Sequence, residues 1–183
     1  MTTILPRRAA QTTLLGLLLA TGMSAAQVPT GPTASTVPTA SGRPVPPIVQ
    51  KWITAWNTGD ANAMAALFTD DGVYQDYAFG AKSQGKSNVG FWVTLTVQNI
   101  PDARGEILDA FQIGDRVAVQ WIFSGTPLRL GPVQGTGKSF AVPVTSVFSL
   151  KGGRIQEVAD YYNRAEVFGQ LGLPTDGFSF PKP

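Results

Sequence analysis

The chain has 183 residues, with 14 Lys or Arg, 12 Asp or Glu, and neither Cys nor His. The missing residue types exclude disulfides, thiol catalysis, Ser-His-Asp triads and His-ligated metals. No basic run is present to follow a phosphate backbone, so we expect no nucleic-acid partner. Any proton chemistry must therefore use Asp, Glu, Tyr or Lys side chains.

Residues 1–26 have the three parts of a secretory signal peptide. Arg7 and Arg8 supply a positive segment, residues 14–20 an apolar run, and Ser24 to Ala26 a small-residue cleavage site. The apolar run is shorter than the roughly 20 residues of a membrane span. We expect an exported protein, periplasmic or secreted, with no membrane span after signal cleavage. An uncleaved anchor is the alternative.

Residues 27–47 are rich in Pro, Thr, Ser and Gly and are almost uncharged. Such a segment cannot bury enough apolar surface to offset the entropy lost on ordering, so we predict a semi-extended tether. One domain is expected over residues 48–174, followed by a C-terminal tail over residues 175–183.

Three helices are predicted in the first half of this domain. Pro46-Pro47 begin the first, in which apolar residues recur at helical spacing, and Asp60 is the N-cap of the second, which extends to about Gly72. The third covers residues 85–100 and is expected to bury the stripe that contains Phe91 and Leu95.

Strands dominate the second half. A short β-like run over residues 73–80 precedes the third helix, and a closing helix over residues 164–172 follows the last strand. Helices gathered early and strands gathered late indicate an α+β fold, with a curved antiparallel sheet wrapped around the N-terminal helices. Pro143 indicates an edge or a bulge in its strand. The later strands are expected at residues 103–114, 115–126, 139–150 and 154–162.

Several segments, in their order and spacing, resemble the SnoaL-like branch of the NTF2-like superfamily, which includes polyketide cyclases and ester cyclases. The resemblance runs from about Val49 to Leu173. It implies a cone-shaped α+β barrel with a deep apolar cavity, and a homodimer formed through the convex face of the sheet. The segments are WITAWNTGDANAMAALFTDD, DRVAVQWIFSGT, TGKSF, GGRIQEVADYY and QLGLP.

Enzyme relatives imply different site residues. Ketosteroid isomerases imply a base at Asp76, but their two oxyanion donors, a Tyr and a protonated Asp, would fall at Trp52 and Ser146. SnoaL-type polyketide cyclases imply an acid/base at Asp160, and the ending Gln170–Gly172 favours them.

A third group of relatives, the limonene-epoxide hydrolases, implies roles for the run Tyr74–Asp76 and for Asp160. Their Arg and second Asp would fall near Gln120 and Ile122, where this chain has neither. The catalytic triad of that group is therefore incomplete in this sequence.

Asp160 and Asp76 are the predicted catalytic residues. Asp160 shares a strand face with Val158 and Tyr162, and burial in a cavity would raise its carboxyl pKa toward neutrality. Its alternatives are a hydrogen-bonded structural acid or a solvated one. Asp76 is either a base, a substrate anchor or an acid that caps the turn over residues 78–85.

Substrate binding is assigned to six further residues, for which an ordinary core role is the alternative. No cofactor and no metal are expected, because Thr69–Asp71 is interpreted as a solvated turn. The Gly-rich stretch at residues 131–139 lacks the spacing of a phosphate loop and is interpreted as a hairpin connection near the cavity mouth. The six residues are Tyr74, Tyr162, Trp52, Trp121, Ser146 and Gln120.

These observations favour a domain that binds a small apolar organic molecule. Cofactor-free acid/base catalysis is the leading hypothesis, as cyclisation, isomerisation or hydrolysis through Asp160 with help from Asp76. A non-catalytic binding module and a purely structural dimerisation unit are the alternatives.

Overall fold

The computed structural model describes residues 42–175, so the predicted signal peptide, residues 27–41 of the predicted tether and residues 176–183 lie outside the described residues. Within residues 42–175, no helix has the length and apolar character needed to cross a membrane. The helices are α1 (Pro47–Thr58), α2 (Ala61–Leu67), α3 (Lys86–Asn99) and α4 (Arg164–Leu171). The strands are β1 (Phe68–Asp76), β2 (Ala81–Gln84), β3 (Arg104–Ile113), β4 (Arg116–Gly125), β5 (Arg129–Leu130), β6 (Val133–Gln134), β7 (Phe140–Lys151) and β8 (Arg154–Tyr161).

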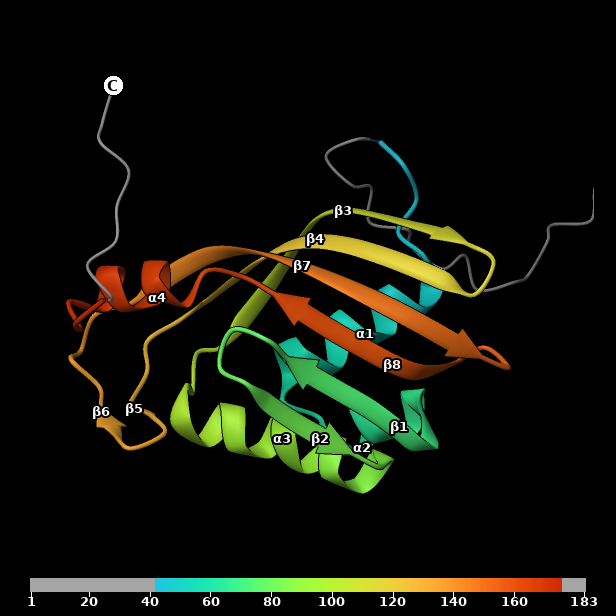
Figure 1. The fold of residues 1–183 in the computed structure, drawn as a ribbon. Coiled ribbons are helices and arrows are strands. Elements are labelled where there is room, and N and C mark those ends of the chain that lie inside the picture. Colours follow the sequence, from blue (N-terminus) through green and yellow to red (C-terminus); the bar gives the residue numbers. More distant parts are fainter. Residues whose placement is uncertain (1–41, 176–183) are drawn as a thin grey trace, which may run out of the picture. The chain divides into compact units, whose positions relative to one another are not determined.

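Six strands form one curved sheet in the order β2-β1-β8-β7-β4-β3 (Figure 1). The pairs β3–β4, β4–β7 and β7–β8 are antiparallel, as the predicted meander requires. Strand β1 pairs with β8 in parallel, however, so the sheet is mixed rather than wholly antiparallel. The predicted α+β class and curved sheet are confirmed, while this parallel pair is an addition that the sequence did not predict.

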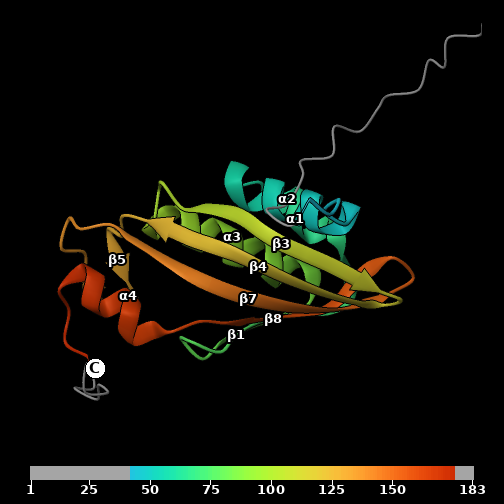
Figure 2. The same ribbon diagram turned by 90° about the horizontal axis from the view of Figure 1, so that it is seen from above.

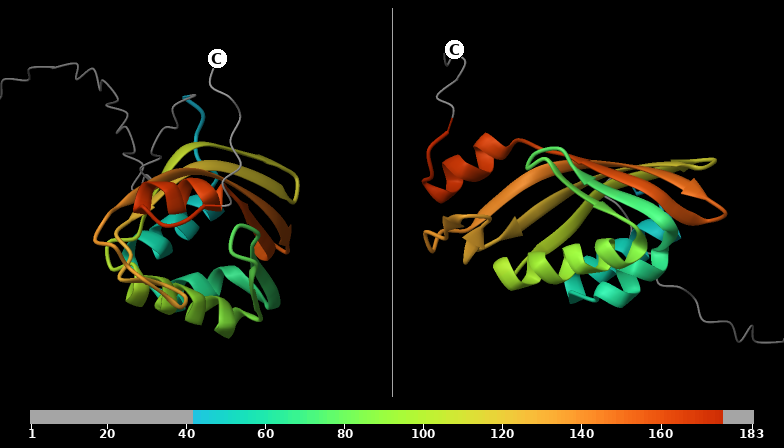
Figure 3. Two further views of the ribbon diagram at one scale, coloured as in Figure 1. Left: turned by 60° about the vertical axis from the view of Figure 1, so that its left-hand side comes forward. Right: turned by 60° about the horizontal axis from the view of Figure 1, so that its bottom comes forward.

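The helices of the first half lie on the concave side of the sheet, where α1 packs on β3 and α3 packs on β1 and β2 (Figure 3). Helix α4 and the separate hairpin β5–β6 lie together at one end of the sheet (Figure 2). A hydrogen bond of 2.8 Å from the Thr136 hydroxyl to the Leu171 carbonyl joins these two segments. Helices α1 to α3 therefore lie on the concave side of the sheet, and α4 and the hairpin border it at one end.

Trp52 is the centre of the core between α1 and the sheet. Its side chain is wholly buried and meets the rings of Trp121 and Phe148 edge to face, with centroid distances of 5.2 and 5.3 Å. Such aromatic pairs each contribute about 0.5–1.5 kcal/mol beyond their buried area. Asn57, five residues further along α1, fixes this helix to β3 through two hydrogen bonds with the backbone of Gly105.

Helix α3 buries a different face from the predicted one. Val89, Gly90 and Val93 are buried, whereas Phe91 is 58% exposed. A Cβ atom at position 90 would lie 2.8 Å from the carbonyl oxygen of Ala61, so only glycine permits this close approach of α3 to α2. The expected stripe with Phe91 is wrong because close backbone packing, rather than side-chain size, selects the buried face.

The boundary after α2 is also earlier than predicted. The helix ends at Leu67, and β1 begins at Phe68. The register with β8 shifts between Phe68 and Val73, so the Asp-Asp-Gly stretch that indicated a turn lies at an irregularity within a strand. The run after Asp76 contains a short strand, β2, that folds back onto β1.

Pro143 lies in an interior strand, β7, but at a point where one neighbour is missing. Strand β8 pairs with β7 only from Thr145 onward, so residues 140–144 pair with β4 alone. The amide of Gln170 fills the open side by accepting the Ala141 N–H and donating to the Ala141 carbonyl. Residues two apart in a strand direct their backbone groups to the same side, so the backbone nitrogen of Pro143 faces the same open side as that of Ala141. Because no strand pairs with β7 on that side at this point, the missing N–H of Pro143 removes no hydrogen bond of the sheet. The predicted edge character is confirmed locally.

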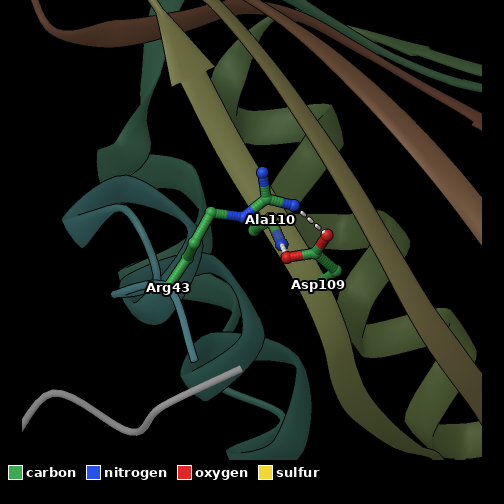
Figure 4. A network of polar contacts seen from close by, with 3 residues as sticks. All are labelled: Arg43, Asp109 and Ala110. Carbon is green, nitrogen blue, oxygen red and sulfur yellow. Dashed lines mark hydrogen bonds and ion pairs between the residues drawn. The ribbon is translucent and has the colours of Figure 1, made fainter. Parts of the chain in front are cut away.

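Residues before α1 pack on the domain. Val45 is 4% exposed and belongs to the core. Arg43 forms an ion pair with Asp109 of β3, whose other carboxylate oxygen accepts the backbone N–H of Ala110 (Figure 4). The packed region therefore begins before Ile48, the predicted start of the domain.

Candidate functional site

Strand register aligns three polar side chains on the inner face of the sheet. Asp160 of β8 is the Cα partner of Asp76 on β1 and of Ser146 on β7. All three are buried, with exposed fractions of 5%, 6% and 0%. Because neighbouring strands lie about 4.8 Å apart, the two carboxyl groups are close neighbours in a largely apolar surrounding.

Each oxygen of the Asp160 carboxylate accepts a hydroxyl hydrogen bond. The Ser146 hydroxyl donates to Oδ1 and the Tyr74 hydroxyl to Oδ2, both at 2.6 Å. The indole N–H of Trp121 donates to the Ser146 oxygen at 2.8 Å. An indole can only donate, so the Ser146 proton is directed at Asp160. These contacts hold the carboxylate in one orientation.

Asp76 is held in a comparable way. Its Oδ2 accepts the Tyr162 hydroxyl at 2.7 Å, and its Oδ1 accepts the backbone N–H of Phe79 at 2.9 Å. The second bond is the turn-capping contact considered from the sequence. Asp76 therefore caps the turn after β1 and also lines the cavity described below.

Burial sets the protonation of this site. Desolvation raises the pKa of Asp160 from its usual 3.8 to about 7, the negative charge of Asp76 adds to the rise, and the hydroxyl bonds oppose it. Burial and the charge of Asp160 raise the pKa of Tyr74, and burial and Asp76 raise that of Tyr162. Both phenols therefore remain hydrogen-bond donors at neutral pH, while Asp160 can exchange a proton.

The two carboxyl groups face a cavity of about 520 Å³ beneath the concave side of the sheet. This volume lies in the range of small-molecule sites, about 300–1,000 Å³. A purely structural scaffold would have this space filled by side chains, whereas here the cavity is open. Its wall contains the sequence-predicted residues Asp160, Asp76, Tyr74, Tyr162 and Trp121, and also Trp56, Phe79, Trp92, Leu95, Phe123, Leu130, Val167 and Phe168.

Three predicted contact residues lie off the cavity wall. Trp52 belongs to the core packing against Trp121, and Gln120 is exposed because it alternates with the buried Val119 and Trp121 along β4. These placements correct the predicted ligand contacts at Trp52 and Gln120. Ser146 also lies off the wall and acts on the site through its bond to Asp160.

Sequence reasoning missed several wall residues. Trp56 follows Trp52 by one helical turn, and helical spacing alone did not show which of the two tryptophans reaches the cavity. Leu130 to Val133 of the hairpin line the cavity. This placement agrees with the prediction that the Gly-rich connection lies near the cavity mouth. Arg129 and Arg164 also line it, and no periodic pattern in the sequence marks them.

The fold and the buried acids on a cavity wall define a protein of the ketosteroid isomerase-like α+β class. Residues 49–158 match the SnoaL-like domain family, and the chain belongs to that family. A protein of this fold from Catenulispora acidiphila, solved in complex with trimethylamine, is 32% identical. The match covers 74% of this chain and 99% of that chain, with a TM-score of 0.65.

Two more distant structures support the fold alone. IdmH of Streptomyces antibioticus, a proposed polyketide cyclase, is 22% identical with a TM-score of 0.59, over 69% of this chain and 96% of that chain. A proposed polyketide cyclase from Pseudomonas putida KT2440 is 24% identical with a TM-score of 0.59, over 73% and 98% of the two chains.

The raised pKa of Asp160 predicts a specific pH dependence of stability. The folded protein retains a proton that the unfolded chain releases near pH 3.8, so this contribution is complete below that pH and is lost as pH rises through about 7. The unfolding free energy of the wild type, relative to Asp160→Asn, should fall by roughly 2–4 kcal/mol between pH 4 and 8. Urea titrations across this range measure it.

Asp102→Asn supplies a control of opposite sign. Hydrogen bonds from the backbone N–H and hydroxyl of Thr126 lower the pKa of Asp102, so its contribution is lost as pH falls. If the difference in unfolding free energy between the wild type and Asp160→Asn stayed constant from pH 4 to 8, the pKa of Asp160 would not be raised.

Proposed function

We propose that this domain binds a small apolar organic molecule in its cavity and performs cofactor-free acid/base chemistry on it. Asp160 is the proton carrier and Asp76 assists. The observation that carries this proposal is a buried carboxyl group of pKa about 7 on the wall of an apolar cavity. A general acid/base works best when its pKa lies near the operating pH.

The chemistry follows from the contacts of Asp160. In its ionised form the carboxylate removes a proton from a carbon next to a ligand carbonyl, and the electron pair of the broken C–H bond becomes an enolate. The protonated Asp160 then returns the proton to another carbon, which is an isomerisation, or to the oxygen formed when the enolate attacks a second carbonyl, which is a cyclisation. Ser146 and Tyr74 keep the carboxylate oriented during these transfers.

Asp76 assists through its charge. Its negative charge raises the pKa of Asp160, which strengthens the ionised Asp160 as a base. Cyclisation, isomerisation and hydrolysis are the reactions that this acid/base set can perform.

A non-catalytic binding module is the second candidate. Both oxygens of both carboxylates accept hydrogen bonds from the protein, and an acid that only orients a ligand is held in the same manner. In that case the cavity binds the ligand without turnover.

Exchange of carbon-bound hydrogen separates the two candidates. The two-ring ketone 2-tetralone carries acidic protons next to its carbonyl, and wild-type protein should accelerate their exchange in D2O. The acceleration should rise with pH through about 7, where Asp160 becomes a base. Asp160→Asn should reduce it by about 10²–10⁴-fold while leaving binding intact. Proton NMR measures exchange, and saturation-transfer NMR measures binding.

Asp102→Asn, which removes a surface carboxylate, is the matched control and should exchange 2-tetralone at the wild-type rate. Binding of 2-tetralone without acceleration by the wild type would favour the non-catalytic module. Unchanged acceleration in Asp160→Asn would assign the proton transfer to another group.

We propose that the domain forms a homodimer through the outer face of the sheet. Register aligns Phe111, Ala118, Val147 and Ala159 in one uncharged row across β3, β4, β7 and β8. Phe111 is 48% and Val147 38% exposed. A row of this kind can pack on the same row of a second copy around a two-fold axis, which is the commonest symmetry of soluble oligomers.

Val147→Glu should convert the dimer to a monomer, because it places two carboxylates at the centre of the apolar contact. Light scattering after size-exclusion chromatography measures the mass. Lys51→Glu, on the exposed side of α1, introduces the same side chain elsewhere and should remain dimeric. A monomeric wild type, or a dimeric Val147→Glu, would contradict this interface.

We also propose that the protein is exported, on the basis of the charged, apolar and small-residue segments of residues 1–26. The chain recovered outside the cytoplasm should begin close to Gln27. N-terminal sequencing measures this, and an intact Met1 in the recovered protein would contradict cleavage at this site.

A further inference from the structure

We propose that the ligand carries a carboxylate, which Arg129 and Arg164 bind at the rim of the cavity while its apolar body occupies the interior. This inference rests on the proposed function, since it names the chemical class that the same cavity accepts: an apolar organic acid. The two arginines lie on β5 and at the first residue of α4, and both line the cavity that contains Asp160 and Asp76.

Both arginines are available to a ligand. Their side chains are exposed at the rim. Within residues 42–175 the ion pairs are Arg43–Asp109 and Lys86–Asp70. Neither rim arginine forms an ion pair there. Two arginines that line one cavity and form no ion pair within these residues are suited to an anion from outside the chain.

Contacts around the rim bring the two arginines to the same end of the sheet. The hairpin that carries Arg129 is bonded to the C-terminal end of α4 through Thr136, and Figure 2 shows the two segments at the same end of the sheet. The guanidinium of Arg164 lies 5.9 Å from the ring centroid of Phe168. Phe168 in turn packs 6.0 Å from Phe79 of the cavity wall. Arg164 therefore lies beside the aromatic part of the cavity wall.

The two carboxylates of the cavity wall, Asp76 and Asp160, give the ligand one orientation. Asp76 and Asp160 are both held by protein donors, and an anionic ligand group close to them would be repelled. The carboxylate therefore lies at the arginine rim, and the uncharged part of the ligand approaches Asp160. A guanidinium can bind a carboxylate through two parallel N–H···O bonds, which gives a directional contact that a lysine does not.

A third arginine of the wall, Arg104, does not take part. Its neighbour Gly105 faces the interior, where an added Cβ would lie 3.1 Å from the Trp121 ring. Successive side chains of a strand point to opposite faces, so the side chain of Arg104 points outward. The carboxylate site therefore consists of the two arginines contributed by the hairpin and α4.

Two fluorescent probes of equal body test this assignment. 1-Pyrenebutyrate carries a carboxylate on an apolar ring system, and 1-pyrenebutanol carries a neutral hydroxyl in its place. Fluorescence titration of the full mature chain should give a Kd for the acid about tenfold lower than for the alcohol. Raising the salt concentration should reduce this preference, because the rim is exposed and its charges are screened.

The variants locate the carboxylate contact. Arg129→Gln combined with Arg164→Gln should abolish the preference for the acid and leave the Kd of the alcohol unchanged. The double Arg→Lys variant keeps the charge but loses the paired bonds, and should retain only part of the preference. Arg154→Gln, at the β7–β8 turn and off the cavity wall, removes the same charge and should behave as the wild type. Melting temperatures confirm that each variant is folded.

Each outcome bears on a different proposal. Equal affinity of the wild type for both probes, or a preference that survives the double Gln variant, would overturn the carboxylate assignment and leave the apolar cavity as the binding site. Binding of neither probe would contradict both this assignment and the proposed binding function.

Discussion

The site depends on one buried interaction, the carboxylate of Asp160 between two hydroxyl donors from the strands on either side. Burial in a low-dielectric surrounding disfavours its charge, whereas Tyr74 and Ser146 favour it, and the balance leaves the pKa at about 7. Trp121 supports this arrangement from behind Ser146. The register of three strands and the aromatic packing of the core therefore serve to place one ionisable group on a cavity wall.

The sequence predicted the inward direction of Asp160 because side chains of one strand alternate between faces. The pairing of Asp160 with Asp76 was not predictable in this way, because it depends on a parallel contact between β1 and β8 and no local pattern specifies it. Gln120 was misplaced although the alternation of Val119 and Trp121 around it indicates the outer face.

Other differences arise where backbone proximity overrides side-chain pattern. Gly90 brings α3 close to α2, and this contact turns the large side chain of Phe91 outward. Trp52 and Trp56 occupy adjacent turns of α1, yet the first packs in the core and the second lines the cavity. A stripe of aromatic residues in the sequence predicts that these side chains are buried. Which of them pack in the core and which line the cavity depends on the packing of the sheet against the helix.

The parallel contact of β1 with β8 has a consequence for how the site comes into existence. Tyr74 and Asp160 are 86 positions apart, and β8 lies between β7 and β1 inside the sheet. Contacts of such sequence separation are costly in loop-closure entropy and slow to form. During synthesis the earlier strands emerge without their acidic partner, so the hydrogen-bonded carboxylate of the cavity wall is completed only when the last strand inserts.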